Sequence, residues 1–329
     1  MSEQADLKKF LATLSKAHEC VISQIRDLER KDIEVIPSGS VTIDSAVGVG
    51  GYPRGRVIEI YGPESSGKTT LALLAIAATQ KKGGVCTFID VEHSLTISWA
   101  AKLGVDVNSL IFSQPDSGEQ ALAFVEELAA SNMVDLIVID SVAGLITKAE
   151  IEGELGDQFV GAQARFLSQA LKKIIPTVGK SKAVILFINQ IRQKIGVMYG
   201  NPNTTPGGLA LKFYSSLRLA VKKVSGSDMK NPDGSIVGHR LSIDVIKNKV
   251  GAPHTTAEFA LNFLTGVDRI DELCTLALQR NLIEQAGPTY KIKTPNGELF
   301  AKGYNNLVEQ VKKDEKLQLH LLVSLGLKK

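Results

Sequence analysis

Aromatic residues and cysteines are scarce in this chain. Only 5% of its 329 residues are Phe, Trp or Tyr, and it has a single tryptophan. That scarcity argues against a nucleic-acid-binding platform that stacks bases on aromatic rings, as OB and RRM domains do. The three cysteines, Cys20, Cys86 and Cys274, are odd in number and widely spaced. We therefore expect neither a disulfide framework nor a zinc site, and a reducing, cytoplasmic location.

Long apolar runs and a strong net charge are also absent from the sequence. No run approaches the ~18 residues that a membrane span requires, and the N-terminus lacks the pattern of a signal peptide, so we expect no membrane partner. The formal net charge of +3 excludes a bulk polycation. However, residues 191–250 contain ten basic and only three acidic side chains. Such a segment can contact phosphates even when the whole chain is nearly neutral.

Patterning along the chain predicts three parts. Residues 1–33 favour a helical segment, because apolar positions recur at helical spacing. Residues 34–264 alternate apolar strands with amphipathic helices, which is typical of an α/β core with a mostly parallel sheet flanked by helices. Residues 265–329 predict a small α+β domain with a hairpin near residues 294–297. Within the core we expect strands at 57–61, 85–90, 136–140, 183–189, 217–221 and 241–249, and helices at 68–80, 118–131 and 160–175.

One motif predicts a phosphate site. Residues 62–69, Gly-Pro-Glu-Ser-Ser-Gly-Lys-Thr, match G-x-x-x-x-G-K-[ST] and lie between a predicted strand and a predicted helix. In such a loop, backbone N–H groups and the helix N-terminus bind phosphate oxygens. The Lys68 ammonium would reach the β- and γ-phosphates, and the Thr69 hydroxyl would be a ligand of Mg²⁺. A chance match is expected only about once in a hundred chains of this length, given ordinary glycine usage.

Polar residues follow the downstream ends of several predicted strands, which share one edge in a parallel sheet. Asp140 ends the apolar run 136–139, where the carboxylate of a Mg²⁺ shell is expected, although a turn residue is the alternative. Glu92 follows strand 85–90 and could deprotonate water, or it could be an ordinary surface glutamate. Gln190 could sense the γ-phosphate or simply cap a backbone group. These side chains are therefore predicted to converge on the phosphate loop.

The phosphate loop through Thr70 is the first of several motifs in a fixed order along the chain. The others are residues 88–93 (Phe-Ile-Asp-Val-Glu-His), 114–120 (Gln-Pro-Asp-Ser-Gly-Glu-Gln), 138–142 (Val-Ile-Asp-Ser-Val), 149–154 (Ala-Glu-Ile-Glu-Gly-Glu), 187–192 (Phe-Ile-Asn-Gln-Ile-Arg), 200–202 (Gly-Asn-Pro) and 204–208 (Thr-Thr-Pro-Gly-Gly). These motifs, in this order, resemble those of bacterial RecA recombinases. The likeness is close over about residues 34–262 and weak in the flanks.

The resemblance implies a RecA-like core with an N-terminal oligomerisation segment, forming helical filaments on single-stranded DNA. Such a protein is a DNA-dependent ATPase that pairs and exchanges homologous strands in recombination and repair, with double-stranded DNA as second partner and ATP and Mg²⁺ as cofactors. Stimulation of a self-cleaving repressor in the SOS response is a further activity that the sequence leaves open.

The resemblance also assigns roles to matching residues. Glu92 would be the catalytic carboxylate, assisted by Lys68, and Gln190 would couple the γ-phosphate to the DNA loops. Lys247 and Lys249 would reach the ATP of the neighbouring subunit; without the resemblance, lysines that protect a sheet edge are the simpler interpretation. The residues expected to bind ATP are Gly62, Pro63, Glu64, Ser65, Ser66, Gly67, Lys68, Thr69, Thr70 and Trp99, with Thr69 and Asp140 at the metal.

The DNA contacts are expected mainly in the long, glycine-rich basic loop within residues 191–212. Its basic side chains and glycine N–H groups suit phosphates, and the resemblance implies that apolar residues such as Ile195 wedge between bases. The alternative is a loop that folds back on the core. Arg165 and Lys172 lie seven residues apart on a predicted helix and would share a face. The expected DNA-binding residues are Arg165, Lys172, Arg192, Lys194, Ile195, Gly207 and Gly208.

Two other classes of protein share part of this pattern. A hexameric RecA-fold helicase or ATPase motor has the same nucleotide site, but it should lack the loop motifs at 152–154 and 207–208. A recombination mediator that binds ATP without hydrolysing it is disfavoured by the intact Lys68 and Glu92. One departure from the family concerns the base site: Thr96 and Trp99 replace an Asp and a Tyr near the adenine. Trp99 can still stack on a base.

Overall fold

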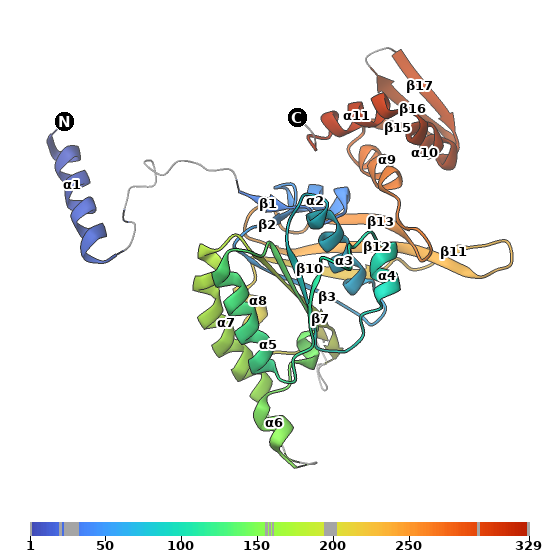
Figure 1. Ribbon diagram of the computed structural model, residues 1–329. Coiled ribbons are helices and arrows are strands. Elements are labelled where there is room, and N and C mark those ends of the chain that lie inside the picture. Colours follow the sequence, from blue (N-terminus) through green and yellow to red (C-terminus); the bar gives the residue numbers. More distant parts are fainter. Residues whose placement is uncertain are drawn as a thin grey trace. The chain divides into compact units, whose positions relative to one another are not determined.

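Figure 1 shows the computed structural model, which describes residues 2–19, 22, 33–154, 157, 159, 161–193, 203–294 and 297–327. The chain consists of two compact units, residues 1–34 and 35–329. The first contains helix α1 (Ser2–Ala17), on which Leu7 and Phe10 are exposed. The helical pattern at the N-terminus therefore corresponds to a 16-residue helix. No helix among the described residues is both long and apolar enough to cross a bilayer.

The second unit is built on a large mixed sheet with the strand order β14-β13-β12-β10-β3-β7-β6-β4-β5. Six of these strands, from β10 to β5, run parallel to one another. The strand order places the phosphate-loop strand in the middle of the sheet. The parallel strands are β10 (Leu217–Lys223), β3 (Val57–Gly62), β7 (Val184–Gln190), β6 (Leu136–Asp140), β4 (Cys86–Asp90) and β5 (Ile111–Ser113).

Side chains from successive residues of each central strand fill two separate cores. In β6, Leu136 and Val138 face the same core as helix α3 (Lys68–Gln80), while Ile137 and Ile139 face the core under helices α5 (Gly118–Ser131) and α7 (Ala162–Lys180). Figure 1 shows helices on both faces of the sheet. Because both faces are buried, the strand reads as a continuous apolar run and not as an alternation.

The other edge of the sheet is antiparallel. Strand β12 (Ile236–Asn248) pairs with β10 and with β13 (Thr256–Asn262), and the latter pairs with β14 (Gly266–Val267). The short strand β11 (Met229–Lys230) forms a hairpin with β12. The remaining core elements are β1 (Val35–Ile36), α2 (Val41–Val47), β2 (Tyr52–Pro53), α4 (Ile97–Lys102), the 3₁₀ turn η2 (Val142–Gly144), α6 (Lys148–Glu152), β8 (Arg192–Gln193), β9 (Asn203–Thr204) and α8 (Ala210–Tyr214).

The C-terminal residues have a hydrophobic core of their own, which includes Leu273, Ile292 and Leu307. Helix α9 (Arg269–Gln279) nevertheless ties them to the main sheet, because its fully buried Glu272 accepts hydrogen bonds from the Ser40 and Thr42 side chains at the start of α2. The other elements here are β15 (Ile283–Ala286), β16 (Thr289–Thr294), β17 (Gly297–Lys302), α10 (Tyr304–Lys313) and α11 (Glu315–Ser324). The division into three domains at residues 34 and 265 stays a prediction.

The predicted fold class, a mostly parallel α/β core with a small α+β C-terminal part, is confirmed. Helices 68–80 and 118–131 have the expected bounds, and β16 and β17 form the expected hairpin. Two elements differ in detail. Helix α7 continues through Pro176 to Lys180, and the expected strand 241–249 is the second half of the longer, antiparallel β12. Antiparallel pairing cannot be distinguished from parallel pairing by strand composition alone.

Candidate nucleotide site and DNA-facing segments

Three residues give the phosphate loop its shape: a glycine where β3 ends and two residues with positive φ angles. A Cβ atom at Gly62 would lie 2.3 Å from the Val221 carbonyl oxygen, so only glycine fits where β3 ends. Ser65 and Gly67 have φ angles of +55° and +86°, and Gly67 is the N-cap of α3. The left-handed conformation turns backbone N–H groups toward the inside of the loop. Among the described side chains, the Ser66 hydroxyl is buried without a hydrogen-bond partner. Buried polar groups normally have such a partner, so this hydroxyl is suited to bind an oxygen atom of a ligand.

The Lys68 side chain lies within this loop. Its Nζ donates to the Pro63 carbonyl oxygen at 2.6 Å, and burial lowers the pKa of the ammonium group. The loop also lines a cavity of about 830 Å³. Trp99 lies on this cavity, as the sequence predicted for a residue near the base, and Phe263 and His239 line it as well. The latter two come from the antiparallel edge of the sheet and were not identified from the sequence.

Thr69 and Asp140 lie together at the end of the central strands. The Thr69 hydroxyl donates to Asp140 Oδ2 at 2.7 Å. Burial, and to a smaller extent the nearby carboxylates of Glu92 and Asp90, raise the pKa of Asp140 to about 6. A divalent cation would offset this crowding of negative charge, and hydroxyl and carboxylate oxygens are suitable ligands for Mg²⁺. The described residues contain no group of three or more His, Cys, Asp or Glu side chains that could hold a metal alone.

Glu92 is positioned by residues from three strands. The backbone N–H groups of Val91 and Glu92 donate to the Asp140 carbonyl oxygen at 2.7 and 3.3 Å. The Glu92 Oε1 atom accepts hydrogen bonds from the Ser141 hydroxyl and, at 2.7 Å, from the Gln190 amide. Glu92 and Gln190, expected to converge on the basis of their strand-end positions, are thus in direct contact. The Glu92 side chain is exposed and is oriented by these two hydrogen bonds, and its role as the catalytic carboxylate stays a prediction.

Two neighbours of Glu92 were missed by reasoning from the sequence. The carboxylate of Asp90 accepts the backbone N–H groups of Ser94 and Leu95, at 3.1 and 3.2 Å, and so fixes the loop that carries Glu92. Ser141 contacts Glu92 directly. Asp90 ends β4 next to Asp140 in β6, so its strand-end position was a usable signal. Ser141 directly follows β6 and had the same strand-end signal, but its contact with Glu92 was not predicted.

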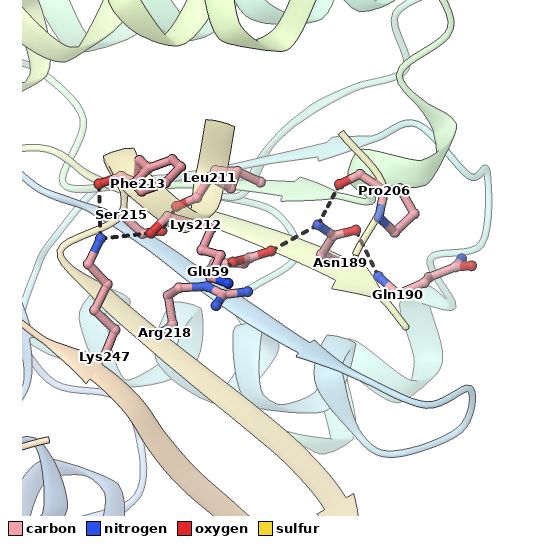
Figure 2. Close-up of polar contacts among 10 residues, drawn as sticks. All are labelled: Glu59, Asn189, Gln190, Pro206, Leu211, Lys212, Phe213, Ser215, Arg218 and Lys247. Carbon is pink, nitrogen blue, oxygen red and sulfur yellow. Dashed lines mark hydrogen bonds and ion pairs between the residues drawn. The ribbon is translucent and has the colours of Figure 1, made fainter. Parts of the chain in front are cut away.

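Figure 2 shows a buried polar network beside this site. Glu59, in the middle of β3, is fully buried and pairs with Arg218 Nε at 2.5 Å. Its other carboxylate oxygen accepts a hydrogen bond from Asn189 Nδ2 at 2.9 Å. The Arg218 guanidinium also lies 4.6 Å from the centre of the Tyr61 ring. A charged residue within an otherwise apolar strand was the only sequence signal of this network, and it did not reveal the partners.

Lys247 and Lys249 lie near the C-terminal end of β12 and just after it. The Lys247 ammonium donates to the carbonyl oxygens of Lys212 and Phe213, at 2.8 and 2.9 Å, at the end of α8 (Figure 2). Its pKa falls to about 8, because partial burial and then the charges of Lys249 and Arg218 disfavour the ammonium form. Lys249 is exposed. The proposed action of both lysines on a neighbouring subunit's ATP stays a prediction.

The predicted DNA-binding residues have different environments. Arg165 and Lys172 are both exposed on α7, opposite the buried Leu167 and Leu171. Arg192 is exposed in β8, which pairs with β9, so residues 194–202 form the connection between these two strands. Lys194 and Ile195 lie outside the described residues.

The two glycines after β9 differ in exposure. Gly207 is buried, and a Cβ atom there would lie 2.5 Å from Leu167 Cδ2. A φ of +80° and this close packing are enough to explain why residue 207 is a glycine, without any contact to DNA. Gly208 is exposed and has a φ of +69°. A Cβ atom at Gly208 would lie 2.8 Å from the Ala164 Cβ atom, so both glycines are required by the fold, and a DNA contact through either backbone stays a prediction.

The local excess of basic residues in 191–250 is partly neutralised in the folded chain. Arg218 pairs with the buried Glu59, and Lys222 and Lys223 pair with Asp244 and Asp228. The basic segment is therefore not one continuous DNA-facing surface. Arg192 is the predicted DNA-binding residue of this segment whose side chain the structure shows exposed.

A phosphate loop at the centre of a mostly parallel sheet, with a threonine–aspartate pair and a glutamate at the strand ends, defines a P-loop ATPase. A model of the RecA N-terminal domain family matches residues 6–268. The chain is 53% identical to Protein RecA of Thermotoga petrophila over 282 residues, which cover 85% of this chain and 78% of the relative. It is 49% identical to Protein RecA 2 of Myxococcus xanthus, with 86% and 77% covered, and 49% identical to Protein RecA of Bordetella pertussis, with 88% and 80% covered.

The chain belongs to the RecA family. The expectation from its motifs is confirmed: it is an ATP-dependent enzyme of recombination and repair, a DNA-dependent ATPase and strand-exchange recombinase that binds DNA and forms filaments. This membership favours the recombinase over the hexameric motor and over the mediator without turnover.

Proposed function

We propose that the residues around Glu92 form the ATPase centre of this recombinase and that the segment from Gln190 to Gly208 couples it to single-stranded DNA. The observation that carries the proposal is the contact between Gln190 and Glu92. It joins the carboxylate best placed to activate water to Gln190, the residue directly before the loop predicted to bind DNA. A nucleotide that changes this contact would be sensed at the DNA loop.

In this proposal each side chain has a defined task. The loop N–H groups and Lys68 bind the β- and γ-phosphates, and Thr69 and Asp140 hold Mg²⁺, which would supply charge neutralisation at those phosphates. Glu92, oriented by Ser141, accepts a proton from the attacking water. The Gln190 amide, now donating to Glu92, can turn to the γ-phosphate. Lys247 and Lys249 would stabilise the developing charge on the ATP of an adjacent subunit, as an arginine finger does.

The proposal also includes the DNA strands and the repressor protein with which this recombinase would interact. The filament would form on single-stranded DNA, and double-stranded DNA would be the second substrate. Stimulation of repressor self-cleavage is a further proposed activity. Buried, unpaired Cys86 and Cys274 agree with a reducing, cytoplasmic environment.

A joint-molecule assay tests the activity directly. Homologous single- and double-stranded DNA should form joint molecules with ATP and Mg²⁺, and should form none without nucleotide or with heterologous DNA.

Electron microscopy with single-stranded DNA and a slowly hydrolysed ATP analogue should show helical filaments. Closed rings without filaments, together with an absence of joint molecules, would contradict the proposal.

The proposed DNA loop makes a quantitative prediction. Alanine at both Arg192 and Lys194 should weaken binding to single-stranded DNA and flatten the log–log dependence of affinity on salt, by about 0.7 for each phosphate that the variant no longer neutralises. The measurement is a fluorescence-anisotropy titration at salt concentrations from about 50 to about 200 mM. Lys302→Ala, in β17, serves as a control for the removal of an exposed positive charge elsewhere. A slope as steep as that of the unmodified protein would show that the loop does not contact phosphates.

A further inference from the structure

Asn189 uses its whole side-chain amide to join three separate segments. It is fully buried, at the next-to-last position of β7. Its Nδ2 donates to Glu59 Oε1 at 2.9 Å and to the Pro206 carbonyl oxygen at 3.1 Å, and its Oδ1 accepts the Gln190 backbone N–H at 2.9 Å. Figure 2 shows Asn189 between these three partners. Both N–H donors of the amide are thereby used, so the side chain has one well-defined orientation.

One of the three partners is a fixed point. Glu59 is fully buried and is held by Arg218 on its other oxygen, at 2.5 Å. A buried charge cannot leave its partner without a large desolvation cost, so this pair resists displacement. Glu59 lies in β3, three residues before Gly62. The anchor of Asn189 is therefore part of the strand that ends in the phosphate loop.

The other two partners lie at the start of the proposed coupling segment, residues 190–208, and close to its end. Gln190 begins it and contacts Glu92, and Pro206 lies between β9 and α8, where the chain returns to the core. A shift of the Gln190 backbone changes the orientation of the Asn189 amide, and the same amide holds the Pro206 carbonyl. The same amide therefore connects the Gln190 backbone to the Pro206 carbonyl.

We propose that Asn189 is a positioning residue that transmits the nucleotide state from Gln190 to the returning end of the DNA loop at Pro206, using the Glu59–Arg218 pair as its anchor. This inference rests on the proposed role of Gln190 and adds a residue that touches neither ATP nor DNA. Its effect must therefore appear in the coupling between the two ligands more than in the affinity for either one alone.

The test compares Asn189→Ala with the unmodified full-length protein. The affinity for a fluorescent oligothymidine is measured without nucleotide and with a slowly hydrolysed ATP analogue, and the ratio gives the coupling. We expect the ratio to fall about tenfold in the variant, which corresponds to about 1.4 kcal/mol. Because coupling is reciprocal, the tightening of analogue binding by DNA should fall by the same factor. A matched control, Asn306→Ala, removes an amide that donates to the Lys302 carbonyl in the C-terminal part and should keep the original ratio.

Asn189→Ala removes one hydrogen-bond donor from the buried Glu59 and can therefore destabilise the fold. A second variant distinguishes this effect from a loss of coupling. Asn189→Ser retains a hydroxyl donor and should show a smaller fall in coupling than Asn189→Ala, and thermal melting identifies which variants are folded. In a double variant with Gln190→Ala, coupling should be no weaker than in Gln190→Ala alone, since both residues act in one path. A merely structural role would instead give additive effects.

The outcomes separate this inference from the proposed function. If the unmodified protein shows no tightening of DNA binding by the analogue, the proposed coupling itself is wrong, and the inference is wrong with it. If the unmodified protein shows tightening and a folded Asn189 variant shows the same ratio, only the inference is overturned. Equal weakening of DNA binding with and without nucleotide would overturn it as well.

Discussion

Glu92→Gln is expected to reduce DNA-stimulated ATP hydrolysis by about 10²–10⁴-fold, the usual contribution of a general base. The amide is the same size as the carboxylate and its oxygen can still accept hydrogen bonds from Ser141 and Gln190, but it cannot accept a proton from water. Binding of ATP and of DNA should remain, because neither depends on that proton transfer. Steady-state phosphate release with single-stranded DNA measures the decrease in hydrolysis, and an anisotropy titration measures the binding.

The control for this prediction is Glu126→Gln. Glu126 forms a surface ion pair with Lys173 at 2.8 Å on the helix layer, and removal of such a pair has little effect. Its hydrolysis rate should match that of the unmodified protein. If Glu92→Gln hydrolyses ATP at the rate of the unmodified protein, Glu92 is not the general base. If the variant fails to bind nucleotide, Glu92 is needed for the structure of the site instead.

Arg218→Ala is expected to lower the free energy of unfolding by about 3–5 kcal/mol, because it leaves the fully buried Glu59 carboxylate without its cation. Trp99, the only tryptophan in the chain, packs against one of the two cores that flank the sheet, so its fluorescence follows the unfolding of this unit. Urea unfolding followed by this signal measures the change as a shift of the midpoint.

Arg54→Ala provides the matched comparison. Arg54 pairs with Asp135 at 2.7 Å, but the side chains are 22% and 26% exposed, so solvent compensates for part of this interaction in the variant. We expect the free energy of unfolding to fall by about 1 kcal/mol or less. Replacing both Glu59 and Arg218 by leucine should cost less than Arg218→Ala alone, since no buried charge remains unpaired. If the two arginine variants are destabilised equally, the Glu59–Arg218 pair is not the anchor described above.

Some features of the site could be read from short stretches of sequence. The phosphate loop is one, because its glycines, its lysine and its threonine act through local backbone geometry between β3 and α3. The strand ends are another: Asp140, Glu92 and Gln190 follow apolar runs, and parallel strands bring such ends to the same edge. The contacts of Thr69 with Asp140 and of Gln190 with Glu92 follow from that rule.

Other features depend on which strands are neighbours. Strand β10 lies beside β3 although the paired residues Glu59 and Arg218 are 159 positions apart, and only this pairing places Arg218 against Glu59. Antiparallel β12 and the segment after β13 bring His239 and Phe263 to the cavity near the phosphate loop. No local pattern encodes such pairings, so the cavity wall and the buried network were not predicted.

The sequence alone thus determined the class of this protein, its nucleotide loop and the strand-end residues around it, because these depend on local chemistry and on hydrophobic periodicity. The tertiary structure decided what orients those residues: Ser141 and Gln190 on Glu92, and Asn189 between Glu59 and Pro206. The physical reason is that a hydrogen bond is specific over about 3 Å, while the residues that form it can be far apart in the chain.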